Sequence, residues 1–182
     1  MGGDGQFYLE KSYSTGNIES TGNDVGGLIG YGYICGTGSS TDGYGKLAIY
    51  NCFSTSSLNG KNNIGGLIGE LNRDIGYRGK TDININNVYV SGKIQAQDIK
   101  GAIIGKYTET KQYNGSLSVS NSYWVLDTTE IDTSKYGIEK ELSKMYNSSE
   151  FPKFDFENIW KIDEGTSMPY LKELDKPDSV NK

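Results

Sequence analysis

Carboxylate side chains are the groups in this sequence with the clearest catalytic potential, because the chain contains no histidine. The absence of histidine excludes Ser–His triads, Cys–His dyads and most zinc sites. Paired carboxylates remain, since many polysaccharide-cleaving enzymes use two of them. The aspartates in question are scattered over segments of differing length: Asp42, Asp74, Asp82 and Asp98. We therefore expect solvated surface acids, no catalytic residue, and a protein that is not an enzyme.

Two short segments could in principle hold a cation. In "WKIDEGTS", Asp163 and Glu164 precede Gly165, a pattern typical of a turn whose acid bonds its own backbone. A calcium ion would need more oxygen ligands than this stretch offers. The segment 36–45, "GTGSSTDGYG", is similar to a calcium-binding nonapeptide, but it occurs once, whereas such sites need consecutive turns. With no phosphate loop or dinucleotide fingerprint either, the sequence predicts no metal and no cofactor.

The two cysteines, Cys35 and Cys52, allow two interpretations. Counting with the strand period places Cys52 on an outer face, opposite Asn51 and Phe53. Cys52 would then be a free, partly buried small side chain. Alternatively, a disulfide would join the 31–46 loop to the following strand, if the protein is exported. Spacing alone does not give the geometry that a disulfide requires, so both interpretations stay open.

Tyrosines are the candidate binding residues, and the chain has 14 of them. A tyrosine ring binds glycans and proteins at a small cost in ordering. It also packs readily over glycine-rich corners, which we expect for any single one. As a group on one side of the fold, they would form a contact surface. The candidates for ligand binding are Tyr31, Tyr33, Tyr77 and Tyr107, and Tyr44 and Tyr113 stand on the same expected loops.

An internal repeat must position these residues. Four segments align at two-residue spacing, the strand period: "FYLEKSY" 7–13, "LAIYNCF" 47–53, "ININNVY" 83–89 and "LSVSNSY" 117–123. Each gives a face that reads aliphatic, aliphatic, asparagine, aromatic, except that the first copy has Phe7 in the first column and Lys11 in the third. Such short strands bury one face when equivalent strands of successive copies stack, so that each side chain contacts its counterpart in the next copy. The sequence therefore predicts an all-β fold, a parallel β-solenoid (β-helix) of about three to four repeats, with asparagine amides bonded along the stack.

A glycine-rich word follows the strand in three copies: "GGLIG" at 26–30 and 65–69, and "GAIIG" at 101–105. Its glycines predict corners that need positive φ or close backbone approach. Ala102 replaces the second glycine, so that position requires a small side chain rather than positive φ. The variable segments 31–46, 70–82 and 106–116 are expected as outer loops.

Composition changes sharply near residue 125. Residues 1–125 hold 10 acidic and 10 basic side chains, whereas 126–182 hold 13 and 8. We divide the chain into a repeat domain (1–125), a C-terminal cap (126–174) over the open end, with an amphipathic helix at 134–146, and a polar linker (175–182). No basic patch predicts nucleic-acid binding, and no apolar run is long enough for membrane insertion.

The repeat resembles the GLUG repeat of bacterial surface proteins. The resemblance rests on "KSYSTGNIESTGNDVGGLIG" at 11–30, "NCFSTSSLNGKNNIGGLIG" at 51–69, and the tail segments 121–134 and 151–174. It implies an extracellular module on a bacterial cell surface, within a larger surface protein. We expect an adhesin-like module that binds a host or matrix glycan or protein, or a rigid display spacer. The alternatives are a fragment of a carbohydrate-active β-helix enzyme and a self-associating surface-layer module.

Overall fold

The structure, a computed structural model, describes residues 5–36, 43–75, 79–109 and 115–182. Each copy of the repeat supplies one strand to each of several sheets. The first copy forms β1 (Gln6–Glu10), β2 (Tyr13–Ser14), β3 (Asn17–Glu19), β4 (Val25–Gly26) and β5 (Ile29–Gly36). The second forms β6 (Tyr44–Ser54), β7 (Ser57–Gly60), β8 (Ile64–Gly65) and β9 (Ile68–Ile75). The third and fourth form β10 (Lys80–Val90), β11 (Ile94–Ala96), β12 (Lys100–Gly101), β13 (Ile104–Glu109) and β14 (Gly115–Val125).

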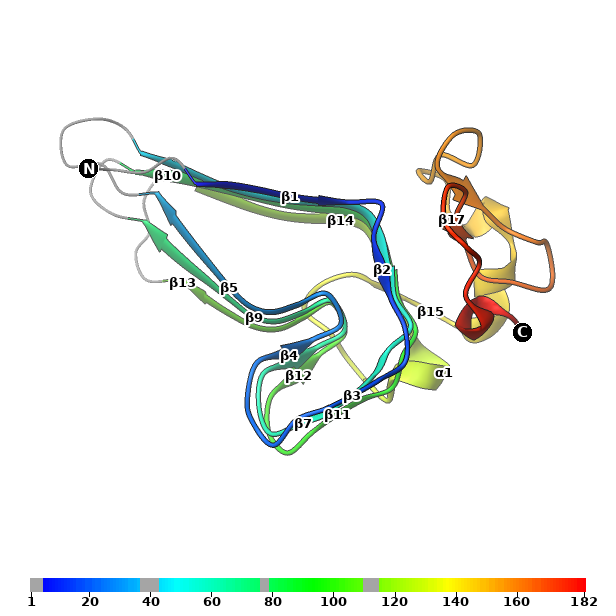
Figure 1. Cartoon of the computed structure of the whole chain (residues 1–182), viewed down its shortest axis with the longest axis horizontal. Coiled ribbons are helices and arrows are strands. Elements are labelled where there is room, and N and C mark those ends of the chain that lie inside the picture. Colours follow the sequence, from blue (N-terminus) through cyan, green and yellow to red (C-terminus); the bar gives the residue numbers. More distant parts are fainter. Residues whose placement is uncertain (1–4, 37–42, 76–78, 110–114) are drawn as a thin grey trace.

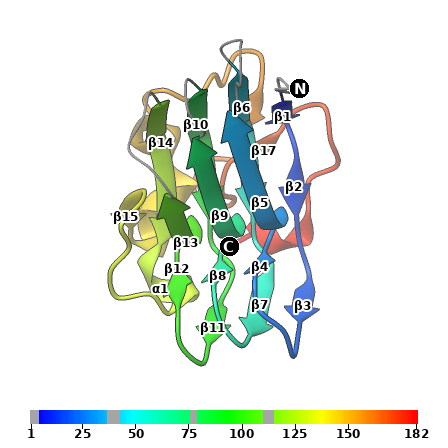
Figure 2. The ribbon, with the colours of Figure 1, turned by 90° about the vertical axis from the view of Figure 1, so that its left-hand side faces the viewer.

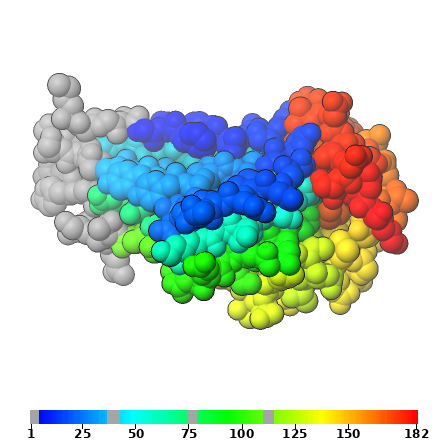
Figure 3. All heavy atoms as spheres, turned by 60° about the horizontal axis from the view of Figure 1, so that its bottom comes forward, coloured from blue at the N-terminus to red at the C-terminus, as the bar shows by residue number. Residues whose placement is uncertain are grey.

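Equivalent strands pair in parallel, so that the copies form successive layers (Figure 2). The sheet orders are β1-β6-β10-β14, β3-β7-β11, β4-β8-β12 and β5-β9-β13. In Figure 1 the copies nearly superpose, and in Figure 3 they appear as neighbouring blue, cyan and green bands. The predicted all-β class with parallel sheets is confirmed. The strands also extend further than expected, into 31–36, 44–46 and 106–109 of the expected loops.

Register follows the columns read from the sequence. Ile49 pairs with Leu9 on one side and with Ile85 on the other, and Ile85 pairs with Val119. The aliphatic columns face inward and form what we call the layer core. Its fully buried members include Leu47, Ile49, Leu58, Leu67, Ile83, Ile85, Val88, Ile94 and Ile103.

The asparagine column breaks the strand period, which corrects one prediction. Lys11, Asn51, Asn87 and Asn121 all have left-handed backbone, with φ between 46° and 54°. One such residue reverses which face the following side chains take, and asparagine tolerates this conformation better than most residues. Cys52 therefore turns into the layer core rather than outward, while Phe53 turns out of it. The predicted amide bonding along the column holds for one pair, because Asn87 Nδ2 donates to Asn51 Oδ1 at 3.3 Å. Asn121 Nδ2 instead donates to Asn86 Oδ1, outside the column, at 3.0 Å.

Crowding explains the glycine word. Positive φ belongs to the preceding residues, Asp24 (60°) and Asn63 (56°), and not to the glycines of the word. A Cβ on Gly27 would overlap the carbonyl oxygen of Gly66, and a Cβ on Gly66 would overlap that of Ala102. Ala102 ends this series because the fourth copy lacks the word. The predicted need for a small residue is confirmed, with its reason in the next layer's backbone.

The C-terminal segment packs on the layers in two places, one at their end and one at their side. Residues 130–141 cover the end of the layers: Ile131 and Tyr136 pack on the layer core, and β15 (Ile138–Lys140) pairs with β14. The remainder lies beside the layers, next to β2 (Figure 1), whereas the cap was expected over the open end. It contains η1 (Leu142–Tyr146), η2 (Ser148–Glu150), β16 (Trp160–Lys161), β17 (Tyr170–Leu171) and η3 (Asp178–Val180), and α1 (Leu126–Thr129) precedes it.

The cap lies there because the aromatic column faces outward. Tyr13, Phe53 and Tyr89 stack face to face, with ring centroids 4.9 and 5.0 Å apart. Trp160 packs against Phe53 and Tyr89 at 6.1 and 6.2 Å. With the buried cap residues these rings form what we call the cap core: Phe53, Tyr89, Tyr123, Val125, Met145, Tyr146, Phe151, Phe154, Trp160, Met168, Tyr170, Leu171 and Val180.

Two expectations about the C-terminal segment are wrong. The helix at 134–146 is replaced by β15 and the short 3₁₀ helix η1. Gly137 has left-handed backbone (φ 86°), and the edge of β14 offers hydrogen-bond partners to Ile138–Lys140. Residues 175–182 are packed rather than a linker, because Val180 is fully buried and the Met168 N–H donates to its carbonyl.

Candidate binding surface

Tyr31 and Tyr33 form an outward-facing aromatic pair on β5. They are two residues apart in one strand, so their side chains leave the sheet on the same face. Tyr31 is 51% exposed and Tyr33 50% exposed. Gly32 between them faces inward, where Leu71 of the layer core lies. The structure thus brings two of the four candidate tyrosines together, on a strand rather than on a loop.

Polar side chains accompany this pair on the neighbouring strands. Glu70 and Asn72 of β9 lie in register with Tyr31 and Tyr33. Asp74 accepts a hydrogen bond from the Tyr33 hydroxyl at 2.8 Å, which raises the pKa of that phenol and keeps it a protonated donor. The outer β5–β9–β13 face consists of Tyr31, Tyr33, Glu70, Asn72, Asp74, Lys106 and Thr108.

The other candidate tyrosines do not join this face. Tyr107 packs edge-on against Tyr136 at 6.5 Å and donates to Glu109 Oε2 at 3.2 Å. Burial raises the pKa of Tyr107 to about 12. Tyr44 stands on β6, where its hydroxyl donates to Asp82. Tyr77 and Tyr113 lie outside the described residues.

A polar network that the sequence interpretation missed lies at the edge of this face. The Asn63 amide, 7% exposed, donates to Asp24 Oδ1 at 2.7 Å and to Glu70 Oε2 at 2.8 Å. Lys106 Nζ lies 3.3 Å from the same Glu70 oxygen. Two carboxylates from adjacent layers therefore meet at one amide, and a lysine of the third layer partly neutralises them. Tyr31, Glu70 and Lys106 each directly follow the last glycine of the word, so column alignment offered a signal.

Comparisons with known proteins gave no match. No protein-family model, no curated protein and no solved structure matches the chain. The GLUG resemblance consequently stays a prediction from the residues.

The aspartates considered for catalysis have separate surroundings. Asp74 on β9 bonds Tyr33, whereas Asp82 on β10 accepts from Ser116 at 2.8 Å. Lys80, 2.8 Å from Asp82, lowers the pKa of that carboxyl. Asp98 is exposed, and Asp42 lies outside the described residues. Asp74 and Asp82 thus lie on different sheets, each with its own partners.

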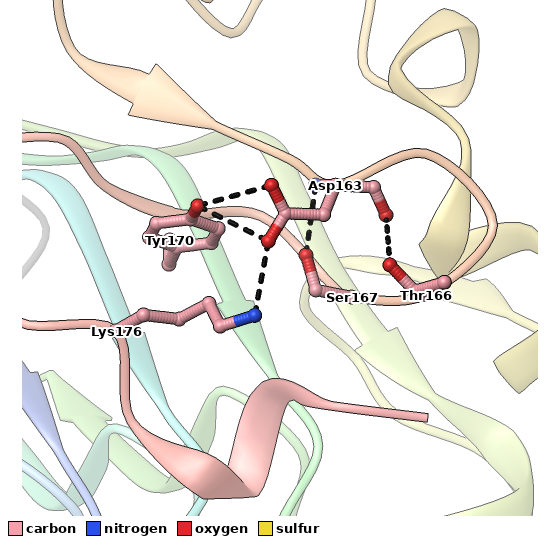
Figure 4. Close-up of polar contacts among 5 residues, drawn as sticks. All are labelled: Asp163, Thr166, Ser167, Tyr170 and Lys176. Carbon is pink, nitrogen blue, oxygen red and sulfur yellow. Dashed lines mark hydrogen bonds and ion pairs between the residues drawn. The ribbon is translucent and has the colours of Figure 1, made fainter.

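Asp163 organises a turn in the cap (Figure 4). Its carbonyl accepts from the Thr166 hydroxyl at 3.0 Å, and its N–H donates to Ser167 Oγ at 2.9 Å. Its carboxylate accepts from the Tyr170 hydroxyl and pairs with Lys176 at 2.9 Å, which lowers its pKa. These contacts give the Asp163 carboxylate a structural role, because its ion pair with Lys176 holds the C-terminal residues against the cap.

Both cysteines carry free thiols in the structure. Cys52 is fully buried, and its thiol donates to the Tyr50 carbonyl. Burial raises the pKa of Cys52 to about 11. Cys35 lies at the end of β5, where it pairs in register with Asp74. The two residues therefore belong to different sheets, with Cys52 inside the layer core.

Within residues 5–36, 43–75, 79–109 and 115–182, no group of three or more Cys, Asp or Glu side chains could hold a metal ion. Over the same described part of the chain, no helix has the length and apolarity needed to span a membrane.

Proposed function

We propose that this chain is a non-enzymatic module of a bacterial cell surface, in which a parallel β-solenoid presents a glycan-binding face. The observation that carries the proposal is the half-exposed pair Tyr31 and Tyr33 on the outer β5–β9–β13 face. The in-register layers support the solenoid. The resemblance of the repeat to GLUG proteins supports the extracellular location.

The chemistry of the face suits a sugar polymer. Tyrosine rings offer apolar surface to the C–H groups of a pyranose while their hydroxyls stay polar. The half-buried Asp74 supplies a carboxylate beside them, which a sugar hydroxyl can bond. Residues two apart in a strand are roughly 7 Å apart, so the pair contacts neighbouring parts of an extended chain.

A glycan array with the purified chain tests this proposal. Binding is expected, and the double substitution Tyr31→Ala/Tyr33→Ala should weaken it at least tenfold, because truncating central aromatic contacts commonly costs more than ~1 kcal/mol. Titration calorimetry with the best glycan measures the loss. Tyr33→Phe separates the ring from the hydroxyl that Asp74 holds.

Tyr8→Ala is the matched control. Tyr8 is 56% exposed but stands on β1, in another sheet. Its substitution should leave glycan affinity unchanged. Equal losses in both variants would contradict a site on the outer β5–β9–β13 face. No array signal from a monomeric chain would favour the rigid display spacer instead.

A second candidate function, a carbohydrate-active enzyme, is favoured by the meeting of Asp24 and Glu70 at Asn63. Two neighbouring carboxylates are the minimum for glycoside hydrolysis. Release of reducing ends from a bound glycan, lost in both Asp24→Asn and Glu70→Gln while binding persists, would establish it. We favour the binding module because Asn63 and Lys106 already engage these carboxylates.

A further inference from the structure

The first layer has an open side. In the part of the chain that the structure describes, β1, β3, β4 and β5 each stand at the end of their sheet, as Figure 2 shows. Phe7 is 47% exposed, whereas its column neighbour Leu47 is 2% exposed. Ile18 and Leu28 are likewise half-buried where Leu58 and Leu67 are fully buried. This apolar surface is therefore the inner face of a layer with nothing stacked on it.

The backbone of β1 is open on the same side. The Lys46 N–H donates to the Gly5 carbonyl at 2.8 Å, and the Lys11 N–H donates to the Tyr50 carbonyl at 3.2 Å. Parallel pairing uses alternate residues of a strand, so the odd-numbered residues of β1 bond β6. The N–H and C=O of Tyr8 consequently point to the unpaired side of the sheet.

We propose that this side is a stacking surface for one further layer of the same repeat, paired in parallel with the strands of the first copy. The added layer places aliphatic side chains over Phe7 and Leu9 and bonds the backbone of Tyr8. The occupant follows from continuity, because the same contact already joins β1 to β6, β6 to β10 and β10 to β14. This proposal is independent of the glycan face.

The capped end of a second copy cannot be this occupant. Residues 130–141 lie across the last layer there, with Ile131 2% exposed in the layer core. The Ala102 N–H donates to Ser134 Oγ at 3.2 Å, and Lys100 Nζ donates to the Glu130 carbonyl at 2.7 Å. The occupant is therefore an uncapped segment that carries the aliphatic columns.

The test is an extended chain. A duplicate of residues 47–82, inserted before Phe7 in the full-length chain, places a complete set of columns next to the first layer. Hydrogen exchange measured by NMR should show the Tyr8 amide protected about 100-fold more than in the parent, because opening would now require local unfolding. The thermal midpoint should also rise.

The matched control carries Leu47→Ser and Ile49→Ser in the added copy only. It has the same length but lacks the two aliphatic side chains that would lie over Phe7 and Leu9, so the Tyr8 amide should exchange as in the parent. Unchanged exchange in the intact extended chain would overturn the proposal. Protection of Tyr8 in the unmodified parent at high concentration, together with a dimer in sedimentation, would also overturn it, since a second copy would then be the occupant.

Discussion

At the scale of single residues, backbone conformation decides which side chains meet. Asn51 and Asn87 both have φ of 54°, and this single feature sends Cys52 inward and Phe53 outward. Asparagine enters the left-handed region at a smaller cost than other non-glycine residues, because its short amide can bond locally. The column is therefore a backbone corner in each copy, and one amide hydrogen bond, from Asn87 to Asn51, links two of its members.

Asn87→Ala should destabilise the chain more than Asn87→Gly. Alanine pays about 1–2 kcal/mol for the left-handed backbone, whereas glycine adopts it freely. Both variants lose the amide bond to Asn51. Urea unfolding should show a free energy of unfolding about 1–2 kcal/mol lower for alanine than for glycine. Equal values would show that the amide, and not the backbone, holds the corner.

Cys52 makes stability depend on alkaline pH. Its pKa is about 11 in the folded chain, against an ordinary value of 9.0. The folded state thus holds the proton more tightly, and this stabilisation is lost as pH rises from about 9 to 11. The loss approaches ~1.4 kcal/mol per pH unit. Urea unfolding of Cys52→Ala at pH 8 and 10.5 should show a smaller fall than the parent, and an equal fall would contradict burial of this thiol.

At the scale of elements, the aromatic column fixes the cap beside the layers. Tyr13, Phe53 and Tyr89 present a continuous stack, and Trp160 covers two of its rings. The Tyr89 hydroxyl also donates to the Pro169 carbonyl at 2.6 Å, in a fully buried position. The cap is thus attached by both packing and a buried hydrogen bond.

Tyr89→Phe should weaken this attachment while keeping the stack. The Pro169 carbonyl would lose its partner, which costs about 1–3 kcal/mol in a buried position. Urea unfolding followed by circular dichroism measures the effect. Tyr13→Phe is the control, because its hydroxyl bonds the Asp175 carbonyl at 3.3 Å in an exposed position. An effect of the same size in the control would contradict the importance of burial.

At the scale of the whole molecule, the two cores share the strands β6, β10 and β14. On β14, Trp124 belongs to the layer core, while its neighbours Tyr123 and Val125 belong to the cap core. Alternation of side chains along a strand makes this sharing possible. The two cores therefore should unfold together rather than as separate domains.

The two tryptophans allow a direct measurement of this cooperativity. Trp124 reports on the layer core and Trp160 on the cap core, and the chain has no others. Trp160→Phe and Trp124→Phe each leave one reporter. In each variant, urea transitions by fluorescence and by circular dichroism should coincide, as expected for two-state unfolding. In Trp124→Phe, a fluorescence transition of Trp160 that precedes the loss of strand signal would show that the cap detaches first.

The sequence by itself determined the repeat, the columns and the parallel register, because stacked copies must place like on like to bury their aliphatic faces. It also determined the need for a small residue in the column of Ala102, which the structure shows at Gly27 and Gly66. Only the tertiary structure decided the side of Cys52, the position of the cap and the meeting of Asp24 with Glu70 at Asn63. Strand periodicity assumes unbroken extended backbone, and the left-handed residue of the asparagine column reverses the faces of the residues that directly follow it.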